Sequence, residues 1–287
     1  MSRASALLLV HGGDVGLVCG ISWLPGESVE AWRVADGLDG VARGLMRTAK
    51  DLELDFAFVP SEEPWAARAV ELLREADVAS FWVVSGLLGR VADRLGWLET
   101  LRLTAARPDA LTGPLDDALA DAIGAIDDGL AAGADAIIVA DDLSGARGPL
   151  VSPDFALDAL LPRYRALVTR ALVGHVPALF HSDGDIRALI PALRREGFAA
   201  THAGSLDPAV LPALLAAVRS AGMGVLGGIS AARLPDHARE MGQAAGVLAP
   251  GGGFAVCDDG GMTAASDIAR YAQALDAARE AYGREQP

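Results

Sequence analysis

The sequence has very little lysine and cysteine and few aromatic residues, and each of these scarcities argues against a particular chemistry, compartment or fold. Lys50 is the only lysine among 287 residues, and it ends a helix-like stretch just before a predicted strand. We expect this lysine to be solvated, and therefore do not expect Schiff-base chemistry at a strand end. Two cysteines, Cys19 and Cys257, are too few for a disulfide framework and fit a reducing compartment, so we expect a cytoplasmic protein. Aromatic residues are only 5% of the chain, and alanine, leucine, valine and glycine dominate, a composition that suits close helix-on-strand packing rather than a β-sandwich.

Long apolar runs and positive charge are also scarce. No apolar stretch has the length of a membrane span, and the run at 6–10 is too short for a signal peptide. The chain carries 24 Lys and Arg against 38 Asp and Glu, a net charge of −14, and its arginines are scattered. Nucleic acid and anionic membrane surfaces are therefore not expected as partners.

Short apolar runs alternate with amphipathic, alanine-rich segments along the whole chain. Hydrophobic residues make up 52% of the sequence, enough for a large core. Runs of this length are typical of strands buried on both faces, separated here by helices. The predicted strands are 6–10, 55–60, 79–86, 134–142, 177–183, 199–204, 222–229 and 253–257, with 16–21 or 246–249 as alternatives. Eight such strand–helix units predict an α/β fold, a single (β/α)8 TIM barrel over 1–287.

Two helices have recognisable ends. Segment 115–132 has apolar residues at helical spacing, and Gly133 follows where a helix commonly ends on glycine. Ser152 precedes Pro153, which predicts a helix with serine as N-cap and proline in its first turn, running to about residue 173.

In a barrel of this kind the reacting groups lie where strands end and loops begin. The polar residues at those positions are mostly acidic and include metal ligands: Asp14, Ser85, Asp141, Asp142, His181, Asp183, His202, Ser230, Cys257 and Asp258. The set has no lysine or arginine to bind a polyanionic substrate. The chemistry is therefore expected to be that of a metal or of acid–base catalysis.

His181 and Asp183 are the most informative pair. In an extended strand, residues two apart point to the same face, so both could bind one metal or act as an acid–base pair. Alternatively, Asp183 caps the next helix and His181 is a satisfied polar residue. One carboxylate of Asp141 and Asp142 is expected at the barrel mouth in a catalytic role.

His202 and Cys257 end two other strands. His202 is a candidate catalytic residue, although a lone histidine is often structural. Cys257 stands beside acids, which raise a thiol pKa and make it a poor nucleophile. It is either an inert small side chain or a metal ligand.

From about residue 115 to 275 the sequence resembles the uroporphyrinogen decarboxylase superfamily of barrels. The segments that carry the resemblance are AGAD at 132–135, ADD at 140–142, GPLVSP at 148–153, FHSDG at 180–184, LGGI at 226–229 and LAPGGG at 248–253. The superfamily contains porphyrinogen decarboxylases and zinc-dependent methyltransferases that serve corrinoid proteins. True decarboxylases carry an arginine signature near the N-terminus, and the corresponding region here reads VHGGD at 10–14. The chain is therefore closer to the methyltransferase branch.

That branch binds zinc through a His-x-Cys pair and a distant cysteine. By resemblance, the zinc ligands here are His181, Asp183 in place of the first cysteine, and Cys257. An aspartate makes the metal site harder, which suits an oxygen or nitrogen heteroatom better than a thiolate.

The leading hypothesis is a metal-dependent methyltransferase, expected to use zinc, that exchanges a methyl group between a small substrate and a corrinoid protein. One alternative is a metal-free decarboxylase of a porphyrinogen or smaller acid that uses Asp141 or Asp142. Another is a non-catalytic barrel that binds a tetrapyrrole or a corrinoid protein. The resemblance also implies a homodimer.

Overall fold

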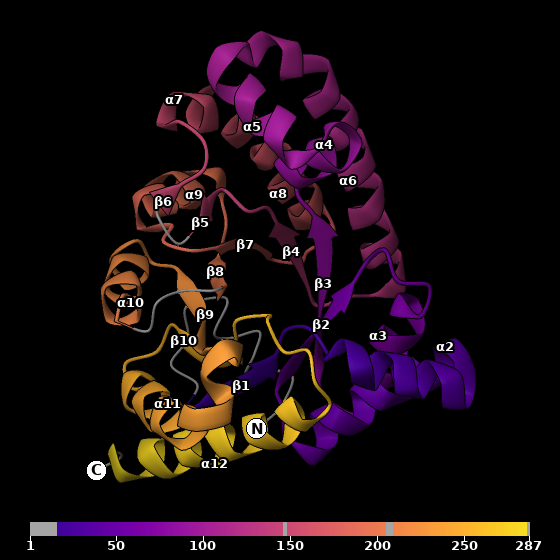
Figure 1. Ribbon diagram of the computed structural model, residues 1–287, viewed down its shortest axis with the longest axis vertical. Coiled ribbons are helices and arrows are strands. Elements are labelled where there is room, and N and C mark those ends of the chain that lie inside the picture. The colour runs from indigo at the N-terminus through magenta and orange to yellow at the C-terminus, as the bar shows by residue number, and fades with distance from the viewer. Residues whose placement is uncertain (1–15, 146–147, 205–208, 286–287) are drawn as a thin grey trace.

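A computed structural model describes residues 16–145, 148–204 and 209–285. Parallel strands form a closed barrel with helices around it (Figure 1). The strands of the barrel are β1 (Val18–Ile21), β2 (Phe56–Pro60), β3 (Ala79–Ser85), β4 (Ala136–Ala140), β7 (Ala178–Asp183), β8 (Ala200–Gly204), β9 (Gly224–Ile229) and β10 (Phe254–Asp258). They neighbour one another in chain order, and β1 closes the barrel by pairing with β2 and β10. The predicted (β/α)8 TIM barrel is confirmed.

Seven of the predicted strands coincide with observed ones. The predicted strand at 6–10 lies outside the described residues. The first described strand is β1, within the alternative range 16–21. The other alternative, 246–249, is wrong because those residues belong to the end of a helix and the turn after it.

Helices follow most strands and cover the outside of the barrel. The α-helices are α2 (Gly26–Asp51), α3 (Ala66–Glu75), α4 (Leu87–Leu95), α5 (Trp97–Ala106), α6 (Thr112–Ala132), α7 (Pro153–Phe155), α8 (Leu161–Val173), α9 (Ile190–Glu196), α10 (Leu211–Ser220), α11 (Leu234–Leu248) and α12 (Ser266–Glu285). Short 3₁₀ turns are η1 (Pro108–Leu111), η3 (Arg187–Leu189) and η4 (Ala231–Arg233). None of the described helices is both long and apolar enough to cross a bilayer.

The two predicted helix signals act as expected. Gly133 ends α6 in the left-handed region at φ 80°, which glycine adopts without strain. The Ser152 hydroxyl accepts the N–H of Phe155 and caps α7. The helix from there to Val173 is not uniform, because a π-helical turn, η2 (Ala156–Leu160), joins α7 to α8. Such turns recur near functional sites.

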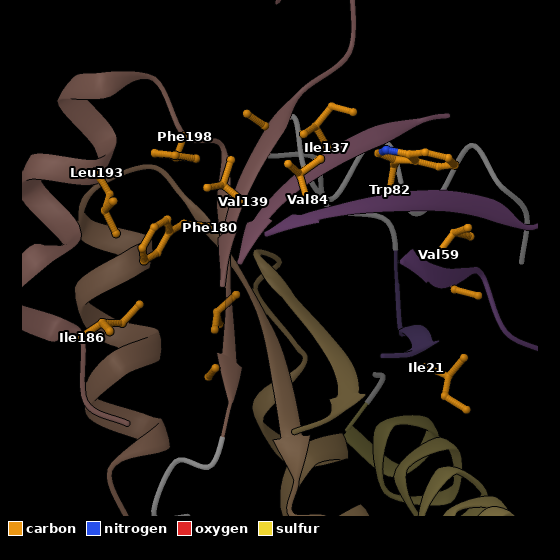
Figure 2. Packing of buried hydrophobic residues seen from close by; sticks show 14 of the residues in the cluster. Ile21, Val59, Trp82, Val84, Ile137, Val139, Phe180, Ile186, Leu193 and Phe198 are labelled. Atoms are coloured by element: carbon orange, nitrogen blue, oxygen red, sulfur yellow. The ribbon is translucent and has the colours of Figure 1, made fainter. Parts of the chain in front are cut away.

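Apolar side chains form two separate layers because successive strand residues face opposite sides of the sheet. The outer layer lies between strands and helices, where Val84, Val139 and Phe180 point away from the barrel axis and Leu193 of α9 packs against Phe180 (Figure 2). The inner layer fills the barrel and includes Phe56, Phe58, Phe81, Leu179, Leu226 and Cys257. Phe56 and Phe81 stack with their ring centroids 4.7 Å apart. The interior is thus a packed floor beneath the mouth.

Two insertions add material at the carboxyl ends of the strands. Helices α4 and α5 lie beyond the end of β3, at the top of Figure 1. A short hairpin, β5 (Ser144–Gly145) with β6 (Gly148–Pro149), follows β4. Both insertions contribute residues to the pocket described below.

Candidate metal centre

Three side chains at the mouth of the barrel come together around His181. Its Nε2 lies 3.8 Å from Oδ1 of Asp142 and 3.9 Å from Oδ1 of Asp183. One donor atom from each residue lies within 4.8 Å of the others. Within the described part of the chain, this is the one group of three or more such side chains that could hold a metal ion.

Strand geometry explains why these residues meet. His181 and Asp183 are two apart on β7, so both face the mouth, whereas Ser182 between them turns back and accepts the N–H of Leu143. Asp142 follows β4, the strand beside β7. Its Oδ1 also accepts the backbone N–H of Asp183, which fixes the two loops together.

His202 lies next to His181 because the two are register partners on the paired strands β7 and β8. Their rings stack with centroids 4.9 Å apart, and the two Nδ1 atoms are 2.8 Å apart. Nε2 of His202 is 2.7 Å from the backbone carbonyl oxygen of Asp258. His202, predicted as catalytic, is fully buried, and its ring packs against Trp23 and Phe58 as well as His181.

Asp141, the other predicted catalytic acid, faces away from the mouth. Its carboxylate is 1% exposed and accepts the backbone N–H groups of Leu88 and Gly89 at the start of α4. The Tyr164 hydroxyl donates to it as well, at 2.6 Å. Burial raises the pKa of Asp141 to about 6, and these hydrogen bonds work against that rise. Its environment is that of a structural anchor.

Cys257, the third ligand expected from the resemblance, does not join the group. Its thiol belongs to the inner apolar layer, with Sγ 3.9 Å from Oδ1 of Asp258. Burial, with the nearby Asp258, raises the pKa of the thiol well above its usual value. The structure brings Asp142, rather than Cys257, to His181 and Asp183.

A pocket of about 400 Å³ opens beside the three side chains. Asp142 and Asp183 line it together with Trp97 of α5 and Leu150. Both carboxylates are partly exposed, at 43% and 41% of their side chains, whereas His181 is buried. Within the group, the histidine is therefore buried, and the two carboxylates are the side chains that a molecule in the pocket can contact.

Two further residues of the site, Trp23 and Gly204, carry no recognisable signal in the sequence. Trp23 packs edge-on against His181, with ring centroids 5.0 Å apart, and it follows β1, which lies in the range 16–21 that the sequence offers only as an alternative to 6–10. Gly204 pairs with Asp183, and a Cβ there would meet Asp183 Oδ1 and lie 2.6 Å from Cε1 of His181. Gly204 ends the predicted strand at 199–204, but its place opposite Asp183 depends on the register between the two strands.

Comparison with known proteins shows the fold. No family model matches the chain, and no curated protein matches its sequence. A methyltransferase from Methanosarcina mazei has a similar structure, with a TM-score of 0.77 over 98% of each chain at 16% identity. A D-allulose 3-epimerase from Methylomonas sp. has a TM-score of 0.55 over 93% of this chain and 98% of that one, at 14% identity. At such identities the likeness is one of barrel architecture.

Proposed function

We propose that the protein is a metal-dependent methyltransferase whose metal is held by Asp142, His181 and Asp183. The observation that carries the proposal is the convergence of these three side chains at the barrel mouth beside a pocket. The similarity in fold to a methyltransferase over nearly the whole chain supports it. The resemblance to the uroporphyrinogen decarboxylase superfamily supports the same class.

The donor set fits a divalent ion of the zinc type. Catalytic zinc sites have three protein ligands, drawn from histidine, carboxylate and cysteine, and leave a further position open. Two donors that lie about 2.0–2.2 Å from one ion are about 3–4 Å apart, and the distances from His181 Nε2 to the two carboxylates fall in that range. Both carboxylates line the pocket, so a small molecule in the pocket would lie beside an ion bound by them.

The three proposed metal ligands and the pocket lining also indicate which kind of substrate would fit. When bound, such an ion acts as a Lewis acid that polarises the heteroatom carrying or receiving the methyl group. Two carboxylates and one imidazole form a hard donor set, which favours oxygen or nitrogen over sulfur at the open position. Trp97 and Leu150 give the pocket an apolar side, suited to the uncharged part of a small substrate.

The second participant in the reaction is a corrinoid protein, which donates or accepts the methyl group. This part of the proposal rests on the sequence resemblance. The chain's own contribution is to orient the small substrate between the carboxylates of Asp142 and Asp183 and the indole of Trp97.

Metal analysis of protein purified without an affinity tag is the first test. We expect about one equivalent of zinc per chain after supplementation. Less than about half an equivalent would count against the proposal. It would point instead to a metal-free decarboxylase or a binding protein.

The second test is methyl transfer itself. The zinc-loaded protein is incubated with methylcobalamin and a panel of oxygen and nitrogen acceptors, and loss of methylcobalamin absorbance is followed. We expect turnover that chelation abolishes and zinc restores. Turnover that persists equally in the chelated protein would contradict a role for the metal.

A further inference from the structure

Three groups at the mouth form one hydrogen-bonded chain: the Asp258 carbonyl, the His202 ring and the His181 ring. The carbonyl oxygen is 2.7 Å from Nε2 of His202, and the two Nδ1 atoms are 2.8 Å apart. The chain ends at Nε2 of His181, which faces Asp142 and Asp183. Each link determines where the next hydrogen lies.

The direction of the chain follows from its fixed end. A backbone carbonyl can only accept, so Nε2 of His202 carries the hydrogen. In a neutral imidazole the other nitrogen then has a lone pair, so Nδ1 of His202 accepts the N–H of His181 Nδ1. A neutral His181 protonated at Nδ1 has its remaining lone pair at Nε2.

The surroundings keep both rings neutral. His181 is 7% exposed and His202 is fully buried. Trp23 packs against both rings, with centroids 5.0 and 5.9 Å away, and Phe58 packs against His202 at 5.0 Å. Burial among aromatic side chains disfavours the charged form of an imidazole, so this enclosure favours neutral rings.

We infer that His202 is a positioning residue that holds His181 in the Nδ1–H tautomer, with the Nε2 lone pair directed at Asp142 and Asp183. A histidine that binds a metal needs this arrangement, and the partner of its other nitrogen fixes it. The partner here is a second histidine, itself fixed by a backbone carbonyl. The inference deepens the proposed function. That the lone pair serves to bind a metal rests on the proposed function, whereas the tautomer itself is a property of the protein without metal.

The direct test is nuclear magnetic resonance of the full chain labelled with ¹⁵N-histidine, without metal, at pH 7. Long-range ¹H–¹⁵N correlations distinguish the two tautomers of a ring. Single variants of His181 and His202 assign the signals. We expect His181 as Nδ1–H and His202 as Nε2–H. A His181 ring with its hydrogen at Nε2, or one that is doubly protonated, would overturn the inference.

Two substitutions then test whether the positioning has an effect. His202→Gln keeps an acceptor toward His181 and a donor toward Asp258, whereas His202→Leu fills the space without either. We expect zinc affinity to fall about 10- to 100-fold in H202L and to recover largely in H202Q. The His181 tautomer should become mixed in H202L alone. Unchanged affinity and tautomer in a folded H202L would refute the inference.

The outcomes also separate this inference from the proposed function. If the wild-type protein binds no zinc but shows the expected tautomers, the proposed metal fails and the positioning of His181 stands. If zinc binds and the tautomer is the opposite one, the metal site stands and the role of His202 fails. Should H202L not fold, the wild-type spectrum alone still decides.

Discussion

Asp141 and Asp142 are consecutive, yet their carboxylates serve opposite sides of the loop after β4. Asp141 accepts the first N–H groups of α4 and the Tyr164 hydroxyl, whereas Asp142 Oδ1 lies 3.8 Å from Nε2 of His181. Alternating side-chain directions in extended backbone produce this division. One residue thus secures the fold and its neighbour belongs to the candidate site, so their substitutions should have separable effects.

Replacing either exposed acid by its amide should weaken metal binding. In Asp142→Asn and Asp183→Asn a neutral amide replaces a carboxylate of the group, and we expect zinc affinity to fall about 10-fold or more. Titration with zinc against a competing chelator measures this. Asp185→Asn is the matched control, because Asp185 is ion-paired with Arg187 outside the group. Equal affinities in all three variants would exclude the proposed ligands.

Asp141→Asn should affect stability instead. An amide nitrogen in place of one oxygen would face an N–H or O–H donor, so we expect the free energy of unfolding to fall by about 2–3 kcal/mol. Tyr164→Phe removes one of the three donors and should cost about 1 kcal/mol. Urea unfolding measures both effects. Zinc affinity should stay at the wild-type value, and a large loss of it would place Asp141 in the site.

Gly204→Ala should disrupt the group from the neighbouring strand. The new Cβ would meet Asp183 Oδ1 and Cε1 of His181, so both side chains must move. We expect zinc affinity to fall about 10-fold or more, as when a supporting residue of a metal site is lost. Gly113→Ala is the control, since a Cβ there meets nothing within 4 Å. A G204A protein with wild-type affinity would show that the group tolerates displacement.

Cys257→Ala tests the ligand expected from the family resemblance. The thiol packs in the barrel interior, apart from the three gathered donors, so zinc affinity should not change. The loss of a small buried group should lower the free energy of unfolding by about 1 kcal/mol. The same chelator competition and urea unfolding are used. A 10-fold loss of affinity in folded C257A would restore Cys257 as a ligand.

Asp55 should make stability depend on pH. Burial raises its pKa to about 6, although the Cys19 N–H that it accepts works against the rise. Between about pH 4 and 6 the folded chain keeps this proton and the unfolded chain releases it, so the free energy of unfolding falls as pH rises. Relative to Asp55→Asn, the wild type should lose up to about 3 kcal/mol across that interval. Parallel pH profiles from urea unfolding would contradict the assignment.

Much of the fold is predictable because buried parallel strands are short apolar runs bounded by polar residues or glycine. The strand at 136–140 is rich in Ile and Val and ends at two acids, and β4 lies there. The first strand is harder to predict from the sequence. Val18–Ile21 contains a cysteine and a glycine, and the apolar run at 6–10 is a stronger signal in the sequence.

The sequence predicts which residue types form the site better than it predicts the directions in which their side chains point. His181 and Asp183 share a face because they are two apart on β7. Whether the side chain at a strand end faces the mouth or the interior depends on register between strands, which no local pattern encodes. Cys257 illustrates this, because it faces the packed interior. The contacts of Trp23 and Gly204 depend on the same register.

The aromatic floor of the barrel has a kinetic consequence. Phe56, Phe58 and Phe81 fill the interior below the two histidines, so whatever reaches Nε2 of His181 must arrive through the mouth and leave by the same way. If a reaction has two reactants, they must bind at this one opening either in succession or side by side. A product must also leave through the opening before the next reactant can enter.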